Sequence, residues 1–191
     1  MELASVRPDG TQILRIRSRA GSELFRAAFV GAYQSVWSEP PYNERFFPDE
    51  AEGVLRKAVS TPDNITLLAV REPGIVAGFA IAYPLHARAD IVREVRGLLP
   101  IDETVYFAEL GVVEDHRGKG LGRELIRLRL EAIDTQRYHH VLMRTSASRN
   151  ATYEMYSAAG FVDTGVYMEV PSRRLDNTVQ TDRRLFMAKV L

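Results

Sequence analysis

Hydrophobic and polar positions alternate along several short stretches of the chain, and this period of two predicts β-strands. In the first of them, Leu14 and Ile16 alternate with two arginines. A hairpin-like connection at Glu72-Pro73-Gly74 joins the second and third. The expected strands are 11–17, 65–71, 75–85, 105–113, 140–145, 161–170 and 184–190.

Other stretches place apolar residues three or four positions apart, which predicts helices. Ser22 is expected to cap the first helix, whose apolar face would be Leu24, Ala27, Ala28 and Gly31. Prolines 40 and 41 interrupt regular structure, and the charged insert 86–103 is assigned no element. The expected helices are 22–36, 48–59, 121–136 and 150–159.

The order of these elements is roughly β-α-α-β-β-β-α-β-α-β-β, which indicates a mixed α/β fold. Strands that follow one another without a helix imply antiparallel pairs. We therefore expect one domain over residues 1–191, with a central mixed sheet of about seven strands and flanking helices.

Composition and charge exclude several kinds of site. The 191 residues contain no cysteine, which excludes disulfides, thiolate metal sites and a cysteine nucleophile. The net charge is +0, so no global field favours nucleic acid or an anionic membrane. The N-terminus lacks the pattern of a secretory signal and no apolar stretch is long enough to span a membrane, so a cytoplasmic location is expected. The four histidines are too scattered to predict a metal site.

A glycine-rich turn, Arg117-Gly118-Lys119-Gly120-Leu121-Gly122, lies between a predicted strand and a predicted helix. Glycines permit positive φ and close ligand approach, and the amides at a helix start attract anions. The turn therefore predicts a phosphate or diphosphate site, with a ligand-free tight turn as the alternative. It fits neither a Walker loop nor a dinucleotide fingerprint.

Leu110-Gly111-Val112 followed by Arg117, Gly120 and Gly122 resembles the acyl-CoA-binding motif of the GCN5-related N-acetyltransferase (GNAT) superfamily. A second match lies downstream, where Asn150 stands six residues before Tyr156 and Gly160-Phe161 follows.

The resemblance implies acetyl-CoA as co-substrate and a sheet whose fourth and fifth strands, 105–113 and 140–145, splay apart. The pantetheine arm would enter the gap and pair with the backbone of Leu110, Val112 and Val113. Amides near 117–122 would hold the diphosphate. On the last helix, Asn150 and Tyr153 would contact the cofactor, although Asn150 also suits a helix N-cap.

Glu109 is the candidate general base, because a carboxylate is unexpected inside an apolar strand and burial would raise its pKa. Strict alternation would place it on one face with Phe107 and Gly111. A structural glutamate paired with an arginine is the alternative. Tyr156 is the candidate acid, which the resemblance places near the thioester sulfur; the alternative is an aromatic core residue.

Trp37 and Tyr42 are candidate acceptor-lining residues, and Asp90 and Glu94 of the insert could attract a cationic amine. The arginine pairs at 173–174 and 183–184 are expected to be solvated. The predicted activity is transfer of an acetyl group from acetyl-CoA to a primary amine of a small molecule. Protein N-terminal or lysyl acetylation and a non-catalytic acyl-CoA sensor are the alternatives. A homodimer is common among similar proteins.

Overall fold

Eight strands form one sheet in the computed structural model, which describes residues 1–72 and 74–191. Pro73, in the expected hairpin connection, lies outside the described residues. The strand order is β1-β2-β3-β4-β5-β6-β8-β7. The strands are β1 (Glu2–Val6), β2 (Gln12–Arg15), β3 (Ile65–Glu72), β4 (Ile75–Pro84), β5 (Thr104–Val112), β6 (His140–Ser146), β7 (Val162–Arg173) and β8 (Val179–Val190).

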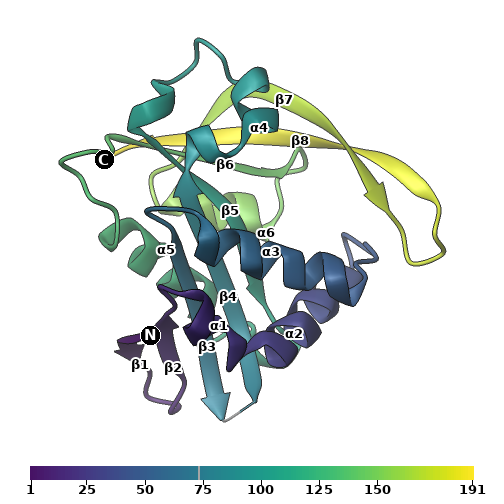
Figure 1. The fold of residues 1–191 in the computed structure, drawn as a ribbon. Helices are drawn as coiled ribbons and strands as arrows, with labels where there is room; N and C mark the ends of the chain where they lie inside the picture. The colour runs from purple at the N-terminus through teal and green to yellow at the C-terminus, as the bar shows by residue number, and fades with distance from the viewer. Residues whose placement is uncertain (73) are drawn as a thin grey trace.

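Helices cover both faces of the sheet (Figure 1). One apolar cluster packs α2, α3 and α4 against one face, and a second packs α5 and α6 against the other. This arrangement confirms the expected mixed α/β fold. The helices are α1 (Arg19–Glu23), α2 (Arg26–Ser38), α3 (Pro48–Ser60), α4 (Ala89–Glu94), α5 (Leu121–Glu131) and α6 (Ala151–Ala158).

The sheet opens between β5 and β6, which run parallel to each other. Their pairing extends from Thr104 opposite His140 to Phe107 opposite Met143. Beyond that point β5 continues to Val112 and β6 to Ser146 with no described pairing between them. This is the splay expected of the fourth and fifth strands; the additional N-terminal strand β1 makes them the fifth and sixth.

A β-bulge interrupts β5 at the start of this gap. Ile81 of β4 lies opposite Glu109, whereas the next residue of β4 lies opposite Phe107, which leaves Ala108 as the extra residue. An extra residue moves every later side chain to the other face. Phe107 therefore packs with the α5 side while Glu109 contacts Tyr33 on the α2 side, and the predicted shared face of Phe107 and Glu109 is wrong.

Several expected elements differ from those observed. No element was predicted for β1, for α1 as a separate helix or for α4 in the insert, and α5 ends at Glu131 rather than at 136. The predicted apolar face of the first helix is also wrong: Leu24 is exposed, and the buried residues of α2 are Phe29, Ala32, Tyr33 and Val36. No helix among the described residues has the length and hydropathy needed to cross a membrane.

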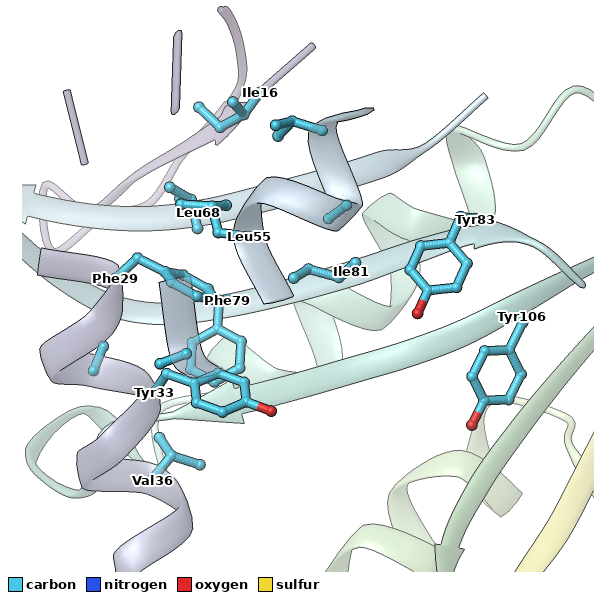
Figure 2. Packing of buried hydrophobic residues seen from close by; sticks show 14 of the residues in the cluster. Ile16, Phe29, Tyr33, Val36, Leu55, Leu68, Phe79, Ile81, Tyr83 and Tyr106 are labelled. Carbon is cyan, nitrogen blue, oxygen red and sulfur yellow. The ribbon is translucent and has the colours of Figure 1, made fainter. Parts of the chain in front are cut away.

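Aromatic residues dominate the core on the α2 side of the sheet (Figure 2). The ring of Tyr33 stacks on Phe79 with centroids 5.4 Å apart. Figure 2 shows Tyr33, Tyr83 and Tyr106 coming from α2, β4 and β5, with their hydroxyl groups directed into the same region. This core therefore carries a polar patch beside β5.

Candidate active site

A cavity of about 740 Å³ lies where β5 separates from its neighbour, between the end of β5 and α6. Most of the residues predicted to bind a cofactor line it, together with the segment that follows α2. Its lining residues are Val36, Pro40, Pro41, Tyr42, Ala158 and the segments 110–112, 116–118, 120–123, 150–152 and 154–155.

The free edge of β5 faces this gap. The amide of Val113 donates to the carbonyl of Ala77 in β4 (3.0 Å). Because hydrogen-bonding direction alternates along a strand, the backbone groups of Leu110 and Val112 point away from β4. The backbone groups of Leu110 and Val112 therefore face the gap, where the carbonyl of Val112 accepts from Arg117. The amide of Val113 is bonded within the sheet instead.

The glycine-rich turn forms one end of the cavity. Gly118 and Gly120 have φ of 71° and 81°, which L-residues rarely adopt, and a Cβ on either would meet no atom within 4 Å. Gly120 is the N-cap of α5, so the amides that follow it lack intrahelical acceptors. The turn therefore directs several backbone donors and the positive end of a helix at open space.

The two basic side chains of the turn differ in position. Arg117 lines the cavity, donates from Nε to the carbonyl of Val112 (2.8 Å) and forms an ion pair with Glu39 at the end of α2. Lys119 does not line it, and its Nζ donates to the carbonyl of Asp115 (2.8 Å). The carbonyl of Lys119 accepts from Arg7, which braces the turn against the segment following β1.

On α6, Asn150 has the predicted N-cap geometry: its Oδ1 accepts from the amides of Thr152 and Tyr153, both at 3.1 Å. Asn150 also lines the cavity. Tyr153, predicted to contact the cofactor, packs against the core on the α5 side and does not line the cavity.

Glu109 is partly buried beside the splay, on the α2 face of the sheet. Tyr33 donates to its Oε2 at 3.3 Å. Burial raises the pKa of Glu109 to about 7, against the opposing effects of Arg88, Arg144 and this hydrogen bond. Within the described part of the chain Glu109 forms no ion pair with an arginine, so the geometry differs from that of a structural salt bridge.

The insert supplies Arg88, which lies over the ring of Tyr106 (5.3 Å) and donates to the Tyr83 hydroxyl (3.2 Å). Arg88 also binds Asp90 through two hydrogen bonds of 2.8 and 2.6 Å, and this contact holds the pKa of Asp90 at about 2. The suggestion that Asp90 attracts a cationic amine is therefore wrong, since its charge is compensated. Glu94 lies on the exposed side of α4.

Tyr156 is 2% exposed and lies on the opposite face from Glu109, with its ring against Phe161. Its hydroxyl accepts a hydrogen bond of 2.7 Å from Arg129, which is completely buried in α5. Arg129 also donates to the backbone carbonyl of Glu109 (3.1 Å). Neither Glu109 nor Tyr156 lines the large cavity, but this arginine connects them at the splay. Arg129 was not among the predicted site residues, although it continues the apolar stripe of α5 four residues after Leu125.

Of the two candidate acceptor residues, Tyr42 lines the cavity and Trp37 does not. Trp37 packs edge-on against Tyr42, with centroids 4.7 Å apart, within the aromatic core. Burial raises the pKa of Tyr42, and the positive charge of Arg184, whose guanidinium lies 5.4 Å from the centroid of its ring, opposes the rise. Tyr42 therefore connects the segment after α2 with β8.

Partly buried charged side chains hold the segment after α2 against the long β7–β8 hairpin. Arg184 bonds Glu44 (2.6 Å) and Asp182 (3.0 Å). Arg174 pairs with Asp182 and donates to the carbonyl of Tyr42 (2.6 Å). The expectation that Arg174 and Arg184 are solvated is wrong, because their side chains are only 14% and 12% exposed. No group of three or more potential metal ligands occurs in the ranges that the structure describes.

Known proteins share this architecture. The model of the acetyltransferase (GNAT) family matches residues 23–161. A curated mouse (Mus musculus) protein named "Probable N-acetyltransferase family 8 member 5" is 34% identical over 61 residues, which cover 32% of this chain and 27% of that protein. The match thus spans about a quarter of the relative's length.

Two solved structures illustrate the similarity in fold. Ribosomal-protein-alanine N-acetyltransferase from Brucella melitensis has a TM-score of 0.65 at 19% identity, covering 93% of this chain and 99% of that one. Arabidopsis thaliana NAA60, solved with a bisubstrate analogue, has a TM-score of 0.60 at 17% identity, covering 94% and 99%. The family match includes the splayed strands, the glycine-rich turn and α6. The chain therefore belongs to the acetyltransferase (GNAT) family.

Proposed function

We propose that this chain transfers an acetyl group from acetyl-CoA to the primary amine of a small molecule. The cavity at the splay is the observation that carries this proposal. It joins the gap-facing edge of β5 to a turn whose amides 118–122 find no acceptor among the described residues, which suits a ligand with an extended amide-bearing arm and an anionic end.

In this proposal the amides of 118–122 and the guanidinium of Arg117 hold the diphosphate. Leu110 and Val112 pair with the pantetheine arm, and Asn150 adds a polar contact beside it. Arg117 would exchange its ion pair with Glu39 for the ligand, which its partial exposure allows. When bound, acetyl-CoA supplies an activated thioester.

Glu109 is proposed to take the proton that the attacking amine loses. Its pKa of about 7 makes it available as a carboxylate near neutral pH and still basic enough to act. Tyr156 is proposed to give a proton to the departing sulfur. The two groups lie on opposite faces of the sheet at the gap, so amine and thioester would approach from opposite sides. Holding both there supplies much of the rate enhancement.

A small-molecule acceptor is favoured because the polar patch on the Glu109 side of the sheet is buried: Tyr33, which donates to Glu109, and the neighbouring Tyr83 and Tyr106 are each at most 5% exposed. A protein acceptor is the second candidate, because one structural neighbour is named for acetylating a ribosomal protein. That neighbour is 19% identical and supports only the fold. The cytoplasmic location and the homodimer stay predictions.

The test is a screen for thiol release from acetyl-CoA and longer acyl-CoA donors. Acceptors are amino acids, polyamines, aminosugars and peptides with free N-termini. The proposal expects release with at least one small amine and a product carrying one acetyl group. Release confined to peptides of particular sequence would establish the protein-acetylating alternative. Tight acyl-CoA binding without release would establish the sensor, and neither binding nor release would overturn the whole assignment.

A further inference from the structure

Arg129 is an unusual residue to find at the centre of this fold. It is 0% exposed and is among the largest fully buried side chains of the chain. None of its described contacts is with a carboxylate. Its guanidinium donates to the hydroxyl of Tyr156 (2.7 Å) and to the backbone carbonyls of Glu109 (3.1 Å) and Ile81 (3.5 Å). It also lies 4.0 Å from the centroid of the Phe107 ring.

A buried cation without a paired anion is costly, and proteins rarely keep one without use. The two backbone carbonyls and the aromatic face are neutral groups and compensate only part of the charge. The atom closest to the guanidinium that can itself acquire a negative charge is the Tyr156 oxygen. The environment of Arg129 is therefore better matched to a phenolate than to a neutral phenol.

We propose that Arg129 is a positioning residue that stabilises the charge left on Tyr156 after proton donation. The inference rests on the proposed function. During transfer the amide C–N bond forms and the thioester C–S bond breaks. Glu109 takes the proton lost by the amine, and Tyr156 gives its hydroxyl proton to the sulfur. Its oxygen then carries a negative charge at 2.7 Å from Arg129. The proton on Glu109 passes to solvent, and solvent returns one to Tyr156.

Arg129 could instead serve only to brace the β5 bulge, because it donates to the backbone carbonyl of Glu109 there. The two roles differ in whether the effect of changing Arg129 depends on the side chain at position 156. A brace acts whether or not residue 156 can ionise, whereas charge stabilisation requires the phenol oxygen.

The experiment is a double-mutant cycle of Arg129→Met and Tyr156→Phe, read as kcat with acetyl-CoA and the best amine from the screen. In the wild-type background Arg129→Met is expected to lower kcat about 100-fold, the lower end of the loss caused by removing one preorganised donor. In the Tyr156→Phe background the same change should lower kcat less than about threefold. Arg129→Lys, which keeps the charge, should recover a substantial part of the loss.

Thermal unfolding and coenzyme A affinity of every variant serve as controls, and Arg129→Gln replaces Arg129→Met in the cycle if the latter does not fold. Equal losses of kcat in both backgrounds would overturn the inference while leaving acetyl transfer intact. Wild-type kcat in Tyr156→Phe would overturn it as well, by removing the acid on which it depends. Absence of turnover in the wild-type protein with every amine is the separate result that overturns the proposed function.

Discussion

The environment of Glu109 determines how this residue can act. Its carboxylate is placed on the α2 face by the bulge at Ala108 and contacts the hydroxyl of Tyr33. Burial then raises its pKa from 4.5 to about 7. A group in that range can change protonation state at neutral pH, which is what a general base needs.

We predict that kcat/KM rises with pH through an ionisation near 7, because the deprotonated carboxylate is the active form. Glu109→Gln should remove this ionisation and lower kcat/KM about 100-fold, the lower range for a general base. A pH–rate profile of both proteins checks this. A wild-type profile that the Gln variant reproduces would contradict the role of Glu109.

The same raised pKa affects stability. Between pH 4.5 and about 7 the folded protein keeps a proton on Glu109 that the unfolded chain releases. The contribution of Glu109 to the free energy of unfolding therefore falls as the pH rises through that window. The Glu109→Gln variant has no such ionisation. The difference in free energy of unfolding between the two proteins should therefore shift in favour of the variant from pH 4.5 to pH 8, by at most about 3 kcal/mol. Urea unfolding of both proteins at the two pH values measures the change. A stability difference that stays constant with pH would show that Glu109 is not buried as described.

At the scale of elements, the glycine-rich turn carries two cationic side chains, and the structure shows which of them faces the cavity. Arg117 lines the cavity, whereas Lys119 is tied to the carbonyl of Asp115. Arg7 stabilises the turn, because it donates to the carbonyl of Lys119 and forms an ion pair with Glu124 of α5. One of the two cations is therefore placed to meet an anionic ligand.

Arg117→Ala should weaken coenzyme A binding about tenfold, since one charge-assisted hydrogen bond contributes roughly 1.5–3 kcal/mol and part is offset by breaking the Glu39 pair. Lys119→Ala is the matched control and should change affinity less than about twofold. Titration calorimetry with coenzyme A at low and moderate salt measures both. A larger effect of Lys119→Ala would reverse the assignment.

Periodicity predicted most elements, because buried faces require regular apolar spacing. It missed β1, whose residues are largely exposed and show no alternation of burial. It could not predict the bulge, because Ala108 fits an uninterrupted strand equally well. The motifs did indicate the residues of the glycine-rich turn and the start of α6 that line the cavity, because these stretches depend on local backbone structure. Other contacts at the site come from segments that are distant in the sequence, and spacing along the chain does not indicate them. These are the contacts of Arg129, of Arg88 and of the charged residues of the β7–β8 hairpin.

At the scale of the whole molecule, the β7–β8 hairpin holds the segment after α2 in place. Residues 43–45 are bonded to the hairpin through backbone contacts such as the amide of Arg45 with the carbonyl of Arg173 (2.8 Å). Glu44, Arg184, Asp182 and Arg174 add partly buried ion pairs. The wall of the cavity formed by Tyr42 therefore depends on the C-terminal strands.

Glu44→Gln should destabilise the fold by about 2 kcal/mol, because Arg184 keeps Asp182 but loses one buried partner. The melting temperature should fall about 4–8 °C. Glu52→Gln removes the more exposed pair with Arg26 and should cost less than about 1 kcal/mol. Thermal unfolding of the two variants gives the comparison, and equal shifts would show that the hairpin ions are no more important than surface pairs.

The central claim is that the turn before α5 binds the diphosphate of acetyl-CoA, and two matched glycine variants test it. Gly120 and Gly97 have φ of 81° and 83°, and a Cβ at either would meet no atom within 4 Å. Glutamate should therefore strain the backbone equally at both positions, but only Gly120→Glu adds bulk and negative charge to the cavity. By calorimetry with coenzyme A, the wild type and Gly97→Glu should bind one equivalent with similar affinity, and Gly120→Glu should show no binding. Undiminished binding by folded Gly120→Glu, or no binding by the wild type, would contradict the account.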